Sequence, residues 1–297
     1  MKTITAIFMT LLTPLSANAL NVFACEPEWG ALVKELAGDI AEITVATTAF
    51  QDPHKLQARP SLIAAVRRAD LLICTGAQLE IGWLPLLLRR SANPHIQVGD
   101  PGYFLAADFV RKIEIPKLVD RSQGDIHPQG NPHLHLDPRN IQRIASALAK
   151  RLTEIDRSGS SVFESRLNDF QDRWSAAMLR WEEESASLAG LRLVSHHRSF
   201  SYLAAWLDLD IVATLEPKPG IPPSGAHLAR LLEQLTPNPP AGVIRTPYSN
   251  EKPSAWLSER LGIAELQLPY TIGGTDDVVD LFTLFDETIR LLKEHVN

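Results

Sequence analysis

Residues 161–188 constrain the fold more than any other stretch of this chain, because they contain neither glycine nor proline. At about 1.5 Å per residue a helix over this range would be about 42 Å long, which is more than one lobe needs. Ser161 and Glu164 have the spacing of a capping box, and Gly190 follows the end. The apolar positions that recur every three or four residues are Phe163, Leu167, Phe170, Trp174, Met178 and Trp181. The segment predicts a rigid helix that joins two lobes.

Strand-like and helical runs alternate on both sides of this segment, which is typical of parallel sheets with crossover helices. The predicted class is α/β, with two lobes, each a mainly parallel sheet flanked by helices, joined by one long rigid helix. Residues 20–160 form the N-terminal lobe, 161–188 the linking helix and 189–297 the C-terminal lobe. The expected strands are 20–24, 40–47, 70–74, 191–195, 211–215, 242–246 and 265–268, and the expected helices are 28–37, 60–69, 79–91, 140–155, 200–207, 226–235, 252–261 and 276–295, with a long loop over 104–130.

The first 19 residues have the pattern of a secretory signal peptide. Lys2 precedes a mostly apolar run, and Ala17-Asn18-Ala19 is a small-x-small cleavage site, so we expect cleavage after Ala19 and a periplasmic protein. The alternative is a buried N-terminal helix. No later run of 18 apolar residues predicts a membrane span. The net charge of −6 argues against nucleic-acid binding, which usually uses a basic patch.

Cys25 and Cys74 each lie near the end of an expected strand. If those strands are neighbours in one parallel sheet, a disulfide can bridge them, and export would permit it. Two buried free thiols are the alternative. A lipid anchor on Cys25 is disfavoured because bulky Phe23 stands where such sites usually have a small residue.

Histidines follow expected strands at three places, where ligands tend to bind in open α/β sheets. The first is His54, in Asp52-Pro53-His54, and the third is His197, where a strand breaks into a helix. The second is the segment from Pro132 to Pro138, which carries His133 and His135. Because both prolines favour extended neighbours, we expect these two imidazoles to share a face.

Three neutral imidazoles with one oxygen ligand suit Zn²⁺, whereas Mg²⁺, Ca²⁺ and Mn²⁺ favour carboxylates and carbonyls. Each histidine taken alone is explained as well by a structural role. Their joint placement after three strands favours a zinc site instead.

The sequence resembles the zinc-binding solute receptors of bacterial ABC importers, of the TroA-like and ZnuA-like helix-linked family, over essentially the whole mature chain. The motifs that carry the resemblance are Asp52-Pro53-His54 with Pro60-Ser61 and Ala69-Asp70, Asn131-Pro132-His133 with Leu136-Asp137-Pro138, and His197-x-x-Phe200-x-Tyr202. The resemblance implies His54, His133 and His197 as ligands of one transported Zn²⁺. A glutamate often replaces the third histidine in the manganese receptors.

Several positions depart from the family pattern. His135 stands where relatives commonly have Trp, which suggests an accessory role, and His127 alone remains of a His-rich loop. The carboxylate that many relatives carry near the final strand is replaced by Leu268-Pro269-Tyr270. Asp276 is the best candidate for the fourth ligand and Asp277 the next, although a helix N-terminus would also explain both. The preceding Gly273-Gly274 makes the chain most similar to the AztC-type subgroup.

The resemblance implies a binding protein without enzymatic activity that captures Zn²⁺ in the periplasm and delivers it, as a monomer, to the permease of an ABC importer. A periplasmic metallochaperone is a further partner that the subgroup suggests. A manganese receptor of the same family is the alternative metal assignment. A three-histidine zinc hydrolase, a TIM-barrel amidohydrolase and a surface adhesin on the same scaffold are the alternatives from other classes.

Overall fold

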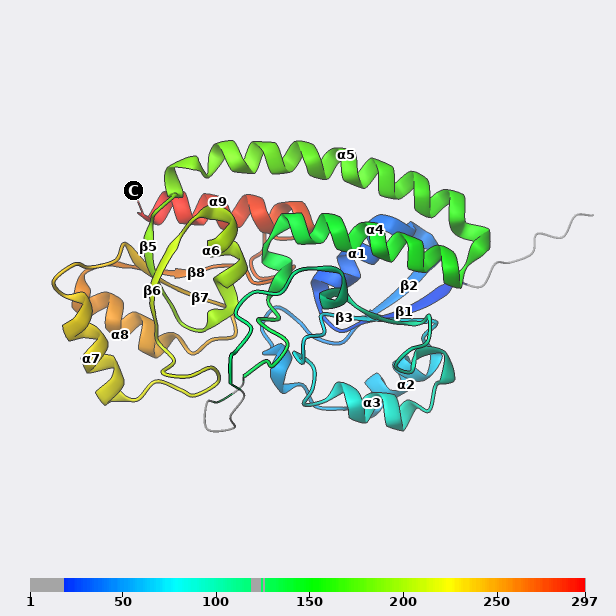
Figure 1. Ribbon diagram of the computed structural model, residues 1–297, viewed down its shortest axis with the longest axis horizontal. Helices are drawn as coiled ribbons and strands as arrows, with labels where there is room; N and C mark the ends of the chain where they lie inside the picture. Colours follow the sequence, from blue (N-terminus) through cyan, green and yellow to red (C-terminus); the bar gives the residue numbers. More distant parts are fainter. Residues whose placement is uncertain (1–18, 119–123, 125, 297) are drawn as a thin grey trace, which may run out of the picture.

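The computed structural model describes residues 19–118, 124 and 126–296. The expected signal segment therefore lies outside the described residues, apart from Ala19. Two four-stranded parallel sheets, each flanked by helices, form two lobes with one long helix across them (Figure 1), which confirms the predicted fold class. None of the described helices is both long enough and apolar enough to span a bilayer.

The N-terminal sheet has the strand order β2-β1-β3-β4, and every pairing in it is parallel. The expected loop over 104–130 was wrong at its start, because β4 pairs with β3 there. A strand of three residues is too short to show an alternating pattern. The strands are β1 Leu20–Ala24, β2 Ala41–Val45, β3 Leu71–Cys74 and β4 Tyr103–Leu105, and the helices are α1 Pro27–Ala37, α2 Pro60–Arg68, α3 Leu84–Ser91 and α4 Pro138–Ile155.

The C-terminal sheet repeats this arrangement in the order β6-β5-β7-β8, again with parallel pairs. Its last helix begins at Leu281, five residues later than expected, so Asp276 and Asp277 lie in a loop and not at a helix N-terminus. The strands are β5 Arg192–Ser195, β6 Asp210–Thr214, β7 Gly242–Arg245 and β8 Ala264–Gln267, and the helices are α6 Ser201–Leu207, α7 Gly225–Leu235, α8 Glu251–Leu261 and α9 Leu281–Val296.

Short 3-10 helices occupy several of the connections. Three of them matter for the site, because they lie at or beside the histidines that the sequence singled out: Pro53–Lys55, Leu134–Leu136 and Arg198–Phe200. Others are Gly38–Ile40, Pro94–Ile96, Ala106–Phe109, Arg157–Gly159 and Ala186–Leu188.

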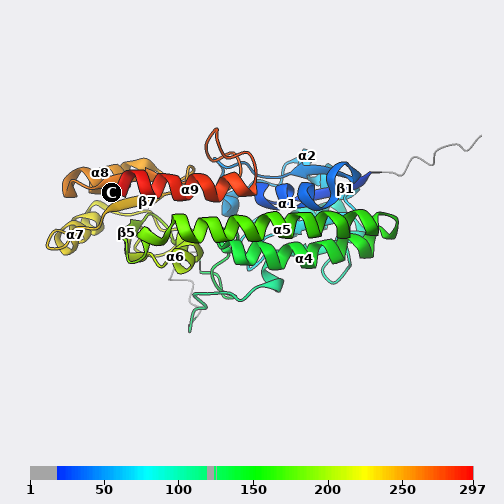
Figure 2. The same cartoon turned by 90° about the horizontal axis from the view of Figure 1, so that it is seen from above.

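The long helix α5, Ser160–Glu184, runs over both lobes (Figure 1). Seen from above, it lies beside α4 and α1 of the N-terminal lobe and α9 of the C-terminal lobe (Figure 2). The helix ends four residues before the predicted limit and continues as the 3-10 turn at 186–188. The predicted capping box is absent, since the helix begins after Gly159 without a side-chain cap.

One apolar core follows α5 along both lobes. The helix buries Phe163, Phe170, Trp174 and Trp181 completely, in a cluster that also contains residues of β1, α1, α4 and α9. The Trp174 indole donates a hydrogen bond to the Pro138 carbonyl oxygen at 2.9 Å, which satisfies its polar atom in the core. Burial of each such ring contributes about 1.5–3 kcal/mol, so this core holds the lobes together.

Cys25 and Cys74 form a disulfide at the carboxyl ends of β1 and β3. The two strands pair in parallel with Ala24 opposite Ile73, which places the following residues side by side. Of the two alternatives that the sequence left open, a disulfide and two buried free thiols, the structure has the disulfide.

Replacing Trp174 by Ala tests whether the core along α5 carries the stability of the whole chain. The loss of a buried indole should lower the free energy of unfolding by about 3–5 kcal/mol. Leu179→Ala, on the same helix but 70% exposed, should change it by less than about 0.5 kcal/mol. Urea unfolding followed by circular dichroism measures both, and similar losses in the two variants would contradict this role.

Candidate metal centre

His54 is presented by the 3-10 helix Pro53–Lys55. Asp52 is its N-cap and Pro53 its first residue, a pairing that starts a helical turn efficiently. The Asp52 carboxylate accepts from the His54 backbone N–H at 3.0 Å and contacts the ring Nδ1 at 2.8 Å. Trp83 Nε1 donates to the Pro53 carbonyl oxygen at 2.8 Å and so anchors the turn. The ring is therefore fixed with Nε2 as its available nitrogen.

His133 follows Asn131-Pro132 and is only 1% exposed. Asn131 Oδ1 accepts from the His133 backbone N–H at 2.9 Å. The ring Nδ1 lies 2.7 Å from the Tyr270 hydroxyl, which comes from the loop after β8 in the other lobe. Nε2 of His133 is buried and has no hydrogen-bond partner among the described residues. A buried nitrogen without a partner is costly unless a ligand binds it.

His197 follows strand β5, where the chain turns into the 3-10 helix Arg198–Phe200. Its Nδ1 lies 2.6 Å from Glu216 Oε2, and the same carboxylate oxygen accepts from the Gly220 backbone N–H at 2.8 Å. Glu216 follows β6, the strand beside β5, so the parallel sheet brings both residues to one edge. The sequence reasoning missed Glu216, although its position just after an expected strand is the same signal that identified the histidines.

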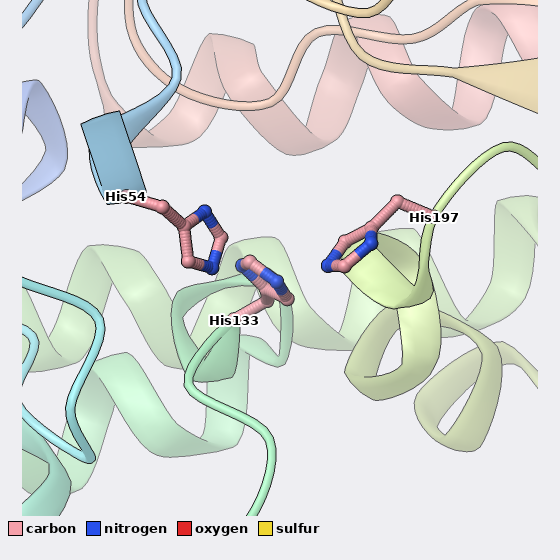
Figure 3. Close-up of side chains that lie close together, drawn as sticks. All are labelled: His54, His133 and His197. Carbon is pink, nitrogen blue, oxygen red and sulfur yellow. The ribbon is translucent and has the colours of Figure 1, made fainter. Parts of the chain in front are cut away.

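The three rings converge between the lobes, as Figure 3 shows. Their ring centroids are 5.5 Å apart for His54 and His133, 5.9 Å for His54 and His197, and 5.4 Å for His133 and His197. One ligand nitrogen of each lies within 4.8 Å of the other two. Bonds of about 2.0 Å to one tetrahedral Zn²⁺ would place the nitrogens about 3.3 Å apart. The three nitrogens would therefore need to move only slightly closer together to bind the ion.

His127 lies against the same cluster. Its Nε2 is 3.2 Å from His54 Nε2, and its ring centroid is 6.5 Å from that of His133. Two clefts meet at the histidines. One of about 390 Å³ is lined by His127, His133 and His197, and one of about 260 Å³ by His54, His197 and Glu216 among others. The cluster is thus reachable by a small ion.

Burial lowers the pKa of two histidines of this cluster, His133 and His127. It lowers the pKa of His133 well below the ordinary value, and the neighbouring His197 and His54 lower it further. Burial, with His54 and His197, lowers the pKa of His127 to about 3. Burial alone would raise the pKa of Glu216, but its hydrogen bond with and charge attraction to His197, together with the Gly220 N–H and His196, lower it overall. The site thus combines two neutral rings, those of His133 and His127, with the charged carboxylates of Asp52 and Glu216, which suits metal binding.

His135 does not share a face with His133, so that prediction was wrong. Leu134–Leu136 is a 3-10 helix and not an extended segment, which turns the two side chains in different directions. His135 Nε2 donates to the Tyr270 carbonyl oxygen at 2.7 Å, and its Nδ1 lies 3.3 Å from Glu28 Oε1. Both ring nitrogens of His135 therefore face protein groups, and it is absent from the group of ligand atoms formed by the three histidines.

Buried carboxylates lie behind His135. Glu26 and Glu28 are fully buried at the start of α1, and Glu80 is fully buried in the turn before α3. Glu80 accepts from the Gly76 backbone N–H, and Glu26 from the Thr75 hydroxyl at 3.2 Å. Burial raises the pKa of Glu80 to about 7, and burial with the charge of Glu80 raises the pKa of Glu26 well above the ordinary range. Glu80 also lies near Cys25 and Cys74, but those sulfurs bond to each other.

Asp276 and Asp277 are both exposed, in the loop between β8 and α9. Among the described residues, no carboxylate oxygen completes the group of ligand atoms that the three histidines form within 4.8 Å. The structure therefore does not bring Asp276 or Asp277 to the cluster. His196, next to His197, is buried, and burial lowers its pKa.

The fold and the site define a class of protein: a two-lobed binding protein with a histidine cluster between its lobes. The chain matches the family model ZnuA, zinc-uptake complex component A, periplasmic, over residues 22–295, and it belongs to that family. The family is one of solute-binding proteins and not of enzymes.

Curated relatives are distant. The chain is 24% identical over 197 residues to the metal ABC transporter substrate-binding lipoprotein ScbA of Streptococcus cristatus, covering 65% of this chain and 60% of ScbA. It is 26% identical to the manganese ABC transporter substrate-binding lipoprotein ScaA of Streptococcus gordonii over 167 residues, 55% of this chain and 51% of ScaA. The chain thus spans little more than half the length of these two relatives.

Two further similarities cover more of the chain. The high-affinity zinc uptake system protein ZnuA of Paracoccus denitrificans is 22% identical over 265 residues, 82% of this chain and 80% of that protein. A crystal structure of ZnuA superposes with a TM-score of 0.79 at 20% identity, over 94% of this chain and all of that chain. At this identity the structural match shows the shared fold.

Replacing Glu80 by Gln tests the buried carboxylates through the pH dependence of stability. The folded pKa of about 7 lies above the ordinary 4.5, so the folded state holds an extra proton between these values. The contribution of Glu80 to stability is therefore fully present below pH 4.5 and is lost as the pH rises through 7.

As the pH rises from 4.5 to 7.5, the free energy of unfolding of the metal-free wild type should therefore fall by about 3 kcal/mol more than that of Glu80→Gln, since one pKa unit corresponds to about 1.4 kcal/mol. Urea unfolding at several pH values measures this. Glu259→Gln, at an exposed position of α8, should keep the wild-type dependence. Parallel curves for the wild type and Glu80→Gln would refute the assignment.

Proposed function

We propose that this chain captures Zn²⁺ in the periplasm and delivers it to the permease of an ABC importer. The observation that carries the proposal is the convergence of His54, His133 and His197, each with Nδ1 held by a protein group. The family model and the names of the relatives support metal capture for import. The two lobes, residues 20–160 and 189–297 in our division, supply two ligands and one ligand respectively.

Zinc is favoured over manganese by the chemistry of the donor set. All three proposed ligands are imidazoles, which suit Zn²⁺, whereas Mn²⁺ favours carboxylate and carbonyl oxygens. The relatives include proteins named for zinc and proteins named for manganese, so the donor set decides the proposal. His127 is the nearest further imidazole and would serve as fourth ligand or as the first residue to contact an arriving ion. Asp276 stays a prediction for the fourth position.

The finer assignments rest on the sequence. The signal peptide, the AztC-type subgroup and a periplasmic metallochaperone as partner follow from the N-terminal pattern and from the loop Gly273-Gly274-Thr275. A zinc hydrolase has less support, because the nearby carboxylates of Asp52 and Glu216 are engaged with histidine Nδ1 atoms. The TIM-barrel alternative is excluded, since the strands form two separate four-stranded sheets.

Loss of one proposed ligand should weaken zinc binding while the fold is retained. We expect His54→Ala and His197→Ala each to lower Zn²⁺ affinity at least about tenfold, because a tetrahedral site loses one of its nitrogen ligands. Competition with a chromophoric chelator measures the affinity. His95→Ala, an exposed histidine of the N-terminal lobe, should leave it unchanged. Equal affinities for the wild type and both site variants would sink the proposal.

Metal preference tests the assignment of zinc within the family. Purified metal-free protein should retain one Zn²⁺ per chain from an equimolar mixture of Zn²⁺ and Mn²⁺ and exclude Mn²⁺, because nitrogen-rich sites bind Zn²⁺ far more tightly. Elemental analysis after gel filtration gives the stoichiometry. Retention of Mn²⁺ in preference to Zn²⁺ would make this a manganese receptor.

A further inference from the structure

Tyr270 links the two lobes at the centre of the proposed site. It lies in the loop after β8 and is only 2% exposed. Its hydroxyl is 2.7 Å from His133 Nδ1, and its carbonyl oxygen accepts from His135 Nε2 at 2.7 Å. The next residue, Thr271, donates to Glu28 Oε2 at 2.5 Å. Three adjacent hydrogen bonds thus clamp a C-terminal-lobe loop onto the N-terminal lobe.

The group that contacts Nδ1 of His133 differs from those that contact Nδ1 of the other two histidines. His54 and His197 contact the carboxylates of Asp52 and Glu216, whereas His133 contacts a neutral phenol. A neutral imidazole binds a metal through Nε2 only when its proton sits on Nδ1. The group that accepts this proton therefore decides whether Nε2 is ready to bind. For His133 the group at Nδ1 is the Tyr270 hydroxyl, which can either donate or accept.

We propose that Tyr270 is a positioning residue for metal capture. Its oxygen accepts the Nδ1 proton of His133 and leaves Nε2 without a proton toward the cleft. This inference rests on the proposed function, in which His133 binds the metal. Because the hydroxyl and the histidine come from different lobes, an N-terminal-lobe ligand becomes competent only when the loop of residues 270 and 271 is seated.

Seating is provided by groups that do not touch the proposed metal position. Glu28 is fully buried on α1 and holds Thr271, and His135 holds the Tyr270 carbonyl oxygen. The His135 ring also packs edge-on against the Tyr270 ring, with centroids 4.7 Å apart. These contacts fix the tyrosine backbone and ring, so that the direction of its hydroxyl is determined.

Tyr270→Phe removes the hydroxyl and keeps the ring. We expect at least about a tenfold loss of zinc affinity, the usual result when an outer partner of a metal-bound histidine is removed. The matched control is Tyr248→Phe. That partly buried tyrosine lies 5.4 Å from Tyr270 between ring centroids. It should bind zinc like the wild type. An unchanged affinity in Tyr270→Phe would overturn the inference.

Thr271→Val separates the hydroxyl from the seating of the loop. It removes the hydrogen bond to Glu28 but keeps the Tyr270 side chain, so its loss of affinity should be smaller than that of Tyr270→Phe. Equal losses in these two variants would assign the effect to loop placement and overturn the role of the hydroxyl. Absence of zinc binding by the wild type would overturn the proposed function itself.

Nitrogen-15 NMR of histidine rings reads the tautomer directly, which a merely structural role would not change. In the metal-free wild type, His133 should carry its proton on Nδ1, and in Tyr270→Phe the proton should move in part to Nε2. Tyr248→Phe should match the wild type. A wild-type His133 protonated on Nε2 would overturn the inference, even if Tyr270→Phe failed to fold.

Discussion

Three imidazole rings brought together inside a protein must be neutral, and each must satisfy the nitrogen that faces away from the cluster. The structure supplies a partner for the outward nitrogen of all three rings, and for His133 it also favours the neutral form by lowering its pKa. Burial lowers the pKa of His133, and the other histidines lower it further, because adjacent imidazolium charges would repel one another. Asp52, Tyr270 and Glu216 contact the three Nδ1 atoms. Nε2 of His133 remains buried without a hydrogen-bond partner among the described residues, a cost that a bound metal ion would remove.

The placement of those rings depends on how the lobes are joined. The apolar core along α5 includes side chains of α1 and α4 from one lobe and α9 from the other, so separating the lobes would expose buried aromatic rings. Closely packed cores resist gradual deformation. Movement on metal binding is therefore expected in the loops that carry the ligands and their partners. The Tyr270 loop, the segment around His127 and the loop that carries Glu216 all touch the histidine cluster from outside it.

Much of the fold was predictable, because the strand–helix alternation and the long apolar face of α5 are strong local signals. The strand β4 was missed because three residues show no period. The three histidines of the site were predictable because each follows a strand. The groups that contact their Nδ1 atoms were not. Tyr270 reaches His133 across 137 positions, and only the packing of one lobe on the other brings them together. His135 was misplaced because prolines favoured an extended segment where Asn131, Asn140 and the chain itself form a tight turn.

X-ray absorption at the zinc edge of the zinc-loaded protein tests the central claim most directly, since it reports the atoms bound to the ion. Our account predicts a first shell of at least three imidazole nitrogens at about 2.0–2.1 Å, with the outer-ring scattering typical of histidine and no sulfur. A shell built from sulfur, or from oxygen with fewer than two imidazoles, would contradict it.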